Sequence, residues 1–205
     1  MEEKNVLIMQ LEPFDFKNMC VLVDRVKDLW TPPDAEESFK KIYAEAVIRQ
    51  DMHENDLQFQ LTENGLLRSV VCASRKNDEN SSKVWWNEVY KDLSTQQQFT
   101  FNLSREYISM MDKKTYAFMN GDDVKLDLFI SAKKGWGKKL LNLATDYFCR
   151  LGFKNLYLWT DCDCNVEWYF SNGYELVDED VYDIFSSETE KYKTYVFRTK
   201  LANGD

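Results

Sequence analysis

The clearest hydrophobic pattern of the chain lies between Val124 and Leu151. Apolar and polar residues alternate from Val124 to Ile130, which predicts a half-buried strand. A short loop with Gly135 and Gly137 follows, and apolar residues then recur at helical spacing as far as Leu151. The first N–H groups of a helix lack helical partners and its dipole favours negative charge, so this strand–loop–helix unit predicts an anion site.

The N-terminal half predicts a strand, two helices and a hairpin. Asp34 and Glu37 have the spacing of a capping box, which places the start of the second helix near Asp34. Asn64-Gly65 predicts a tight turn, because both residue types tolerate positive φ. The predicted segments are strand 6–9, helices 19–30 and 39–46, and strands 57–61 and 67–73.

The middle of the chain, residues 76–115, predicts a helical insertion. Apolar spacing favours one helix over 84–93 and a second over 103–111, the latter beginning near Asn102 or Ser104. Residues 116–119 and the strand from Val124 flank Asn120-Gly121, a sequence typical of a second hairpin.

The C-terminal third predicts a strand over 156–160, a short aromatic helix that ends near Tyr174, and closing strands over 174–182 and 193–201. Gly152 and Gly173 each follow a helical pattern and are predicted to end those helices. Strands and helices in this order predict an α/β protein with a mixed sheet and helices on its faces. The sequence has no repeat and no linker composition, so we expect one domain over residues 1–205.

The net charge of the chain bears on which ligands it can bind. The net charge of −9 argues against general binding to nucleic acid or to anionic membranes, which requires an excess of Lys and Arg. It is compatible with a cationic substrate such as an amine, and equally with acidic residues that only maintain solubility.

The five cysteines do not have the spacing of a disulfide scaffold. The N-terminal residues do not resemble a signal peptide, and no apolar run is long enough to span a membrane. We therefore expect reduced thiols and a cytoplasmic protein. Cys162-Asp163-Cys164 does not have zinc-site spacing and His53 is the single histidine, so no metal site is predicted.

Two segments carry a resemblance to the GNAT superfamily of acyl-CoA-dependent N-acetyltransferases. The run Gly135-Trp136-Gly137-Lys138-Lys139-Leu140-Leu141 is similar to the second half of the family's pyrophosphate loop. Trp168-Tyr169 and Gly173-Tyr174 are similar to its later aromatic-Tyr and Gly-Phe pairs, and Cys164-Asn165 fits the segment before that short helix. The long insertion resembles one branch of the superfamily. The resemblance implies six to seven mostly antiparallel strands, use of acetyl-CoA, and a homodimer as one option.

The cofactor residues follow from the same resemblance. Backbone groups near Phe129 and Ile130 are expected to hold the pantetheine and the thioester carbonyl. The family's Arg/Gln position falls on Ala132, so the phosphate charge would fall to nearby lysines as mobile point charges. The expected cofactor-binding residues are Phe129, Ile130, Lys133, Lys134, Gly135, Trp136, Gly137, Lys138 and Asn165.

The implied reaction is attack of a neutral amine on the thioester of acetyl-CoA. Tyr169 is the expected general acid, because a phenol stays protonated at neutral pH and can protonate a leaving thiolate; a packed core tyrosine is the alternative. Asp127 in the central strand and Asp161 at the end of the next strand are the candidates for the general base, with Asp127 preferred. Asp163, Glu167 and His53 are weaker candidates, with His53 expected at the surface, and a water chain is the remaining alternative.

The predicted function is therefore an acetyl-CoA-dependent N-acetyltransferase for a primary amine of a small molecule or protein. The alternative is a GNAT-like binding or regulatory module with weakened or lost acetyl-CoA use, which the missing Arg/Gln at Ala132 motivates.

Overall fold

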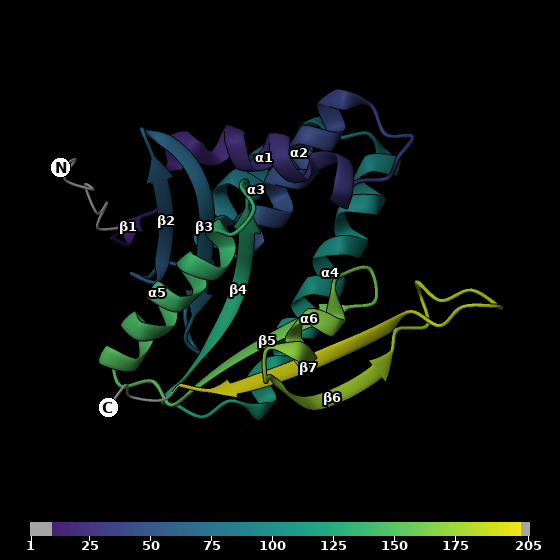
Figure 1. The fold of residues 1–205 in the computed structure, drawn as a ribbon. Helices are drawn as coiled ribbons and strands as arrows, with labels where there is room; N and C mark the ends of the chain where they lie inside the picture. Colours follow the sequence, from purple (N-terminus) through teal and green to yellow (C-terminus); the bar gives the residue numbers. More distant parts are fainter. Residues whose placement is uncertain (1–9, 202–205) are drawn as a thin grey trace.

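The computed structural model describes residues 10–201, which form one seven-stranded sheet with helices on both faces (Figure 1). The strand order is β1-β2-β3-β4-β5-β7-β6, and only the β4–β5 pair is parallel. The elements are β1 (Glu12–Pro13), η1 (Phe16–Asn18), α1 (Met19–Trp30), α2 (Glu37–Gln50), β2 (Gln58–Glu63), β3 (Leu66–Ser74), α3 (Lys83–Val89), η2 (Tyr90–Asp92), α4 (Thr95–Phe118), β4 (Asp123–Ser131), α5 (Trp136–Arg150), β5 (Asn155–Asp161), α6 (Val166–Ser171), β6 (Glu175–Val181) and β7 (Lys193–Lys200). The predicted α/β class and mostly antiparallel sheet are confirmed.

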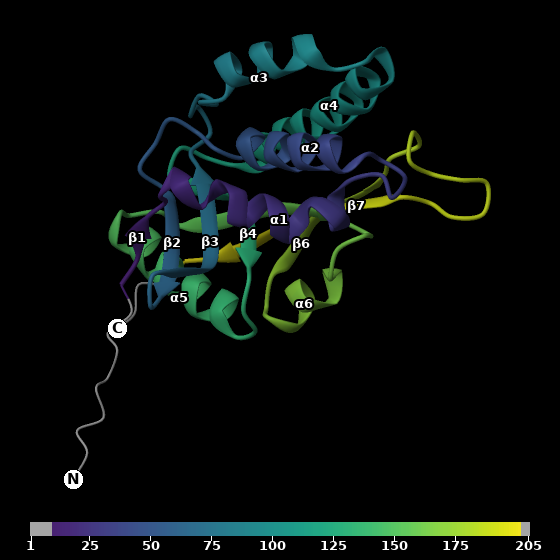
Figure 2. The same cartoon turned by 90° about the horizontal axis from the view of Figure 1, so that it is seen from above.

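Helices α1 and α2 cover one face of the sheet, and α5 covers the other (Figure 2). The apolar face of α5 packs on β2, β3 and β4 through residues such as Leu140 and Phe148, both fully buried. Helix α4 packs outside this layer against β5 and β7. Among the described residues, no helix is long and apolar enough to cross a membrane.

A β-bulge in β4 opens the middle of the sheet. Cys72 pairs with Leu128 and Ala73 pairs with Leu126, which leaves Asp127 as the extra residue on β4. A bulge bends its strand and increases the local twist. The parallel pairing of β4 with β5 is accordingly restricted to residues 123–125 and 155–157, and the two strands separate beyond it (Figure 1).

The hairpin prediction at Asn64-Gly65 is confirmed, because both residues have positive φ, 54° and 74°. Gly152 and Gly173, predicted to end helices, follow α5 and α6 and have positive φ, 89° and 80°. The strand predicted over 6–9 lies outside the described residues.

Three predictions in the helical regions are wrong. Helix α2 begins at Glu37 after Glu36, whose side chain makes no capping bond, so Asp34 is not the cap. Residues 116–118 form the last turn of the 24-residue helix α4 and not a hairpin strand. That helix begins much earlier than predicted, because Ser94 and Gln97 form a capping box.

Candidate active site

The separation of β4 and β5 leaves a cavity of about 950 Å³ between them. One wall comes from α1, α2 and α4, and the opposite side carries Tyr169 of α6. The lining residues are Leu29, Trp30, Tyr43, Val47, Asp51, Ser104, Tyr107, Ile108, Leu126, Asp127, Leu128, Phe129, Leu158, Trp159, Thr160, Asp161, Cys162, Asp163, Cys164, Tyr169, Phe185, Ser187, Glu190 and Tyr192. The volume is in the range of small-molecule sites.

Tyr169 is held at the cavity by aromatic packing. Its ring stacks on Phe197 with centroids 5.4 Å apart, and Trp168 and Tyr174 contact it edge-on at 5.3 and 5.5 Å. Burial raises the pKa of Tyr169 well above its ordinary value. The phenol is therefore a proton donor at neutral pH, which is the state that the sequence-based role requires.

The loop predicted to bind an anion leads directly into the start of α5. Gly135 occupies the N-cap position with φ of 83°, a conformation that disfavours other residues. Gly137 packs directly on β4, since a Cβ atom there would lie 3.0 Å from Phe129 Cζ and 3.2 Å from Ser131 Cβ. Trp136 is buried, so the loop and the cavity wall at Phe129 form one packed unit.

The three lysines of this loop are exposed, and one already has a partner. Lys133 Nζ lies 2.7 Å from a carboxylate oxygen of Glu63, which also accepts from Arg68 at 2.9 Å. The hydrogen bond from Lys133 holds the pKa of Glu63 below its ordinary value. A phosphate at this loop would compete with Glu63 for Lys133, whereas Lys134 and Lys138 have no such contact among the described ion pairs.

The remaining predicted cofactor residues occupy different environments. Phe129 lines the cavity. Ile130 packs on the opposite face against the α1–α2 layer, so only its backbone faces the region between the strands. Asn165 is exposed and immediately precedes α6.

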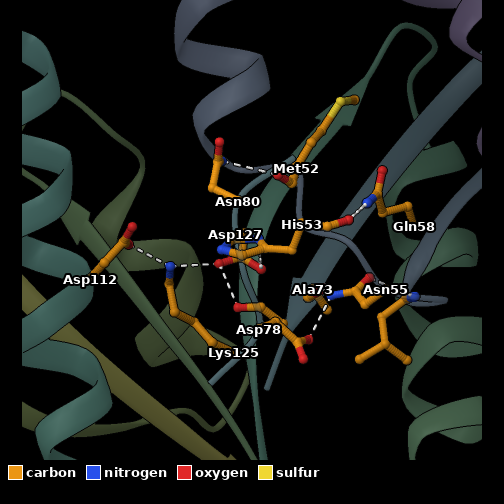
Figure 3. Close-up of polar contacts among 12 residues, drawn as sticks. Met52, His53, Asn55, Gln58, Ala73, Asp78, Asn80, Asp112, Lys125 and Asp127 are labelled. Carbon is orange, nitrogen blue, oxygen red and sulfur yellow. Dashed lines mark hydrogen bonds and ion pairs between the residues drawn. The ribbon is translucent and has the colours of Figure 1, made fainter. Parts of the chain in front are cut away.

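Asp127 belongs to a buried polar cluster behind the bulge (Figure 3). Its side chain is 0% exposed, and Oδ1 lies 2.5 Å from Lys125 Nζ and accepts from Ser74 Oγ at 2.9 Å. Lys125 also contacts Asp112. Burial alone would lower the pKa of Lys125, but Asp127 and Asp112 outweigh it and hold that pKa well above its usual range. The Asp127 carboxylate is therefore a partner of a charged lysine.

His53 is buried, 7% exposed, so the predicted surface position is wrong. Its Nδ1 lies 3.9 Å from Asp127 Oδ2, too far for a hydrogen bond, and neither atom has another partner among the described residues. Its backbone bridges to Asn80 after the turn that ends α2, and this turn carries the ring inward. The polar run 50–56 concealed this burial from the sequence.

The other carboxylates predicted as candidates for the general base divide into two groups. Asp161, at the end of β5, accepts from Tyr107 Oη at 2.9 Å and from the Asp163 backbone at 3.2 Å, so its side chain is already occupied. Asp163 and Glu167 are exposed, and of these two only Asp163 lines the cavity.

Asp51 is a candidate that the sequence reasoning missed. It follows α2, is 6% exposed and lines the cavity. Burial, followed by repulsion from Asp112, raises the pKa of Asp51 well above its ordinary value. The sequence contained a sign of this burial. Asp51 lies seven residues after Ala44 and three after Ile48, so it falls on the same buried face of the helical pattern. Among the described residues, no group of three or more His, Cys, Asp or Glu side chains is arranged to hold a metal ion.

No family model and no curated protein sequence matches the chain. Solved structures do match. The ribosomal-protein-S18-alanine N-acetyltransferase of Escherichia coli is 12% identical, with 97% of each chain covered and a TM-score of 0.54. A putative GNAT acetyltransferase of Desulfovibrio desulfuricans is 10% identical over 95% of this chain and 98% of that chain, with a TM-score of 0.54. Arylalkylamine N-acetyltransferase 2 of Aedes aegypti is 13% identical over 95% and 100%, with a TM-score of 0.50. The chain therefore has the fold of the GNAT acetyltransferases.

Proposed function

We propose that this protein is an acetyl-CoA-dependent N-acetyltransferase that transfers an acetyl group to a primary amine of a small molecule or protein. One observation carries the proposal. The bulge at Asp127 separates β4 from β5, and the cavity between them is lined by a protonated tyrosine, Tyr169. A thioester and an amine need such a shared space, with a proton donor within reach of the leaving sulfur.

The start of α5 supports a phosphate site beside this cavity. Among the first N–H groups of the helix, that of Trp136 donates to the Lys133 carbonyl at 3.1 Å, which leaves those of Gly135, Gly137 and Lys138 for an anion. Lys133, Lys134 and Lys138 supply positive charge, while Trp136 and Gly137 fix the loop against β4. In this arrangement the acetyl-CoA pyrophosphate occupies the loop.

Backbone N–H groups of the separated part of β4, near Phe129 and Ile130, would hold the pantetheine and stabilise the negative charge that develops on the thioester oxygen. Asn165, just before α6, lies on the side of Tyr169 and would contact the pantetheine arm. The buried cluster that contains Asp127 would receive the proton of the amine. The Asp127 carboxylate is itself paired with Lys125, so Asp127 would act as a member of this cluster and not as an isolated base.

The test is a thiol-release assay with acetyl-CoA and a panel of primary amines, run on wild type and Tyr169→Phe. We expect Tyr169→Phe to lower kcat by about 10²-fold or more with little change in acetyl-CoA affinity, because general-acid catalysis contributes roughly this factor. Tyr147→Phe, outside the cavity on α5, is the control and should retain wild-type rates. An unaltered kcat in Tyr169→Phe would remove Tyr169 from the mechanism.

A second candidate function is a binding or regulatory module on the same fold with weakened or lost acetyl-CoA use. The observations that favour it are Ala132 at the position of the family's Arg/Gln and the pairing of Lys133 with Glu63. The measured affinity for acetyl-CoA separates the two functions, because a module that has lost the use of acetyl-CoA would bind it weakly or not at all.

A further inference from the structure

A buried carboxylate on the α2 side of the cavity has no role in the reaction scheme above. Asp51 is 6% exposed, lines the cavity, and its Oδ1 atom has no hydrogen-bond partner among the described residues. A buried carboxylate oxygen without a partner is unfavourable, so this site calls for a donor that enters from the cavity.

The charges around Asp51 are unbalanced. Three buried or nearly buried carboxyls, Asp51, Asp112 and Asp127, surround the single ammonium group of Lys125. That ammonium is already committed, because it contacts both Asp112 and Asp127. The cluster therefore has an excess of negative charge, and Asp51 is the member of it that has no contact with Lys125 within 4.0 Å.

The cavity itself favours a cation. Every charged side chain among the described residues that line it is acidic, namely Asp51, Asp127, Asp161, Asp163 and Glu190. Asp127 and Asp161 are already hydrogen-bonded, and Asp163 and Glu190 are exposed. Two buried carboxylates that line the cavity therefore have an oxygen without a partner among the described residues, Asp51 and Asp127. Lys125 already neutralises Asp127 at 2.5 Å, whereas Asp51 has no such contact among the described ion pairs, so a cation in the cavity is expected to bind at Asp51.

Large aromatic side chains line the same cavity as Asp51. Trp30, Tyr43, Tyr107 and Trp159 come from α1, α2, α4 and β5 and line the same cavity. Such walls bury an apolar body and attract a cation through the faces of their rings. A small, strongly hydrated inorganic cation would gain little from them.

We propose that the acceptor is a protonated primary amine with an aromatic or apolar body, and that Asp51 binds its ammonium group and takes the first proton from it. This rests on the proposed acetyl transfer for its chemistry, but the binding part stands on the cavity alone.

The ammonium nitrogen gives one proton to the Asp51 carboxylate and becomes a neutral nucleophile. The nitrogen lone pair forms the C–N bond to the thioester carbon, the C–S bond breaks, and its electron pair leaves on sulfur. The sulfur takes the phenol proton of Tyr169, which is replaced by the second proton of the nitrogen. The proton on Asp51 is released to solvent, so one proton is released in each turnover.

The pH dependence involves every titratable group that faces Asp51. These are Asp112 from α4, Lys125 and Asp127 from β4, and Cys72 from β3. Lys125 stays charged, and burial raises the pKa of both Asp51 and Asp127. We expect kcat/KM to rise with pH as Asp51 ionises, and Asp51→Asn to remove that rise.

The binding experiment uses 2-phenylethylamine and its neutral analogue 2-phenylethanol, titrated by calorimetry without acetyl-CoA. We expect wild type to bind the amine at least about tenfold more tightly than the alcohol, and Asp51→Asn to lose this preference. Asp92→Asn, an exposed carboxyl outside the cavity, is the matched control and should keep it. Agmatine, added as a third probe, tests the apolar body; tighter binding of agmatine than of 2-phenylethylamine would overturn that part.

Equal affinity of wild type for the amine and the alcohol would overturn the role of Asp51, and this comparison does not depend on the folding of any variant. Failure of the proposed function has a different signature, because acetyl-CoA would then not bind while the amine preference remained. If both hold, the kinetic test follows: Asp51→Asn should raise KM for the amine, lower kcat and leave acetyl-CoA affinity unchanged. Wild-type kinetics with an unchanged pH profile would overturn the proton transfer.

Discussion

Removal of the buried ammonium group of Lys125 should strongly destabilise the protein. The Lys125 side chain is 0% exposed and its Nζ contacts Asp112 and Asp127, with Asp51 nearby. Lys125→Met keeps an unbranched apolar stem of similar length and removes only the charge. The variant would bury three carboxyls without a cation.

The expected loss is about 3–5 kcal/mol in the free energy of unfolding at pH 7, the range for one partner removed from a buried ion pair. The direction in which this loss changes with pH follows from the pKa values of the buried carboxyls. In the variant, the folded-state pKa of Asp127, already raised by burial, rises further above its unfolded value because Lys125 no longer opposes the shift. The folded state then binds protons more readily, so the loss is smallest at low pH and grows as pH rises from about 4 to 7.

Urea unfolding at pH 5 and pH 7 measures both effects. Lys193→Met is the matched control, because it removes a lysine from an exposed ion pair. Lys193 lies 2.7 Å from Glu179, and the two side chains are 48% and 42% exposed. Such a surface pair is worth at most about 1 kcal/mol. The double variant Lys125→Met/Asp127→Asn should recover part of the loss. A loss below about 1 kcal/mol at pH 7, or no recovery in the double variant, would refute the account of the cluster.

Two further variants test the loop and the insertion. Gly137→Ala should destabilise the protein by about 1–3 kcal/mol and weaken acetyl-CoA binding, because its Cβ would lie 3.0 Å from Phe129 Cζ. Gly121→Ala has open space, so an equal loss there in urea unfolding would contradict the packing argument. Ser94→Ala should cost about 1 kcal/mol through loss of the α4 cap, whereas an unchanged urea midpoint would show that the capping box contributes nothing.

The sequence predicted the parts of the fold that local patterns encode. The alternation over 124–130 and the helical face up to Leu151 correspond to β4 and α5, and Asn64-Gly65 forms its turn. The pattern failed where tertiary contacts decide. Residues 116–118 form the last turn of α4, and Tyr116 Oη lies 2.7 Å from Ser74 Oγ of β3, a tertiary contact that no local pattern reveals.

The site was predictable in the same uneven way. Tyr169 and the Gly135 loop were predicted through a motif, and the structure places Tyr169 in the cavity lining and Gly135 at the N-cap of α5. The bulge at Asp127 depends on the register between β3 and β4, which alternation alone does not specify. Asp51 was missed because its role arises from a cavity between strands that are far apart in sequence.

The central claim is that the protein uses acetyl-CoA, and a calorimetric titration of acetyl-CoA into the wild-type protein tests it most directly. The account predicts saturable binding at one site per chain, weakened in Lys134→Ala/Lys138→Ala because these lysines supply charge to the phosphates. Desulfo-coenzyme A, which lacks the thioester, should bind at the same loop. No detectable heat at millimolar acetyl-CoA would contradict the acetyltransferase and leave the binding module.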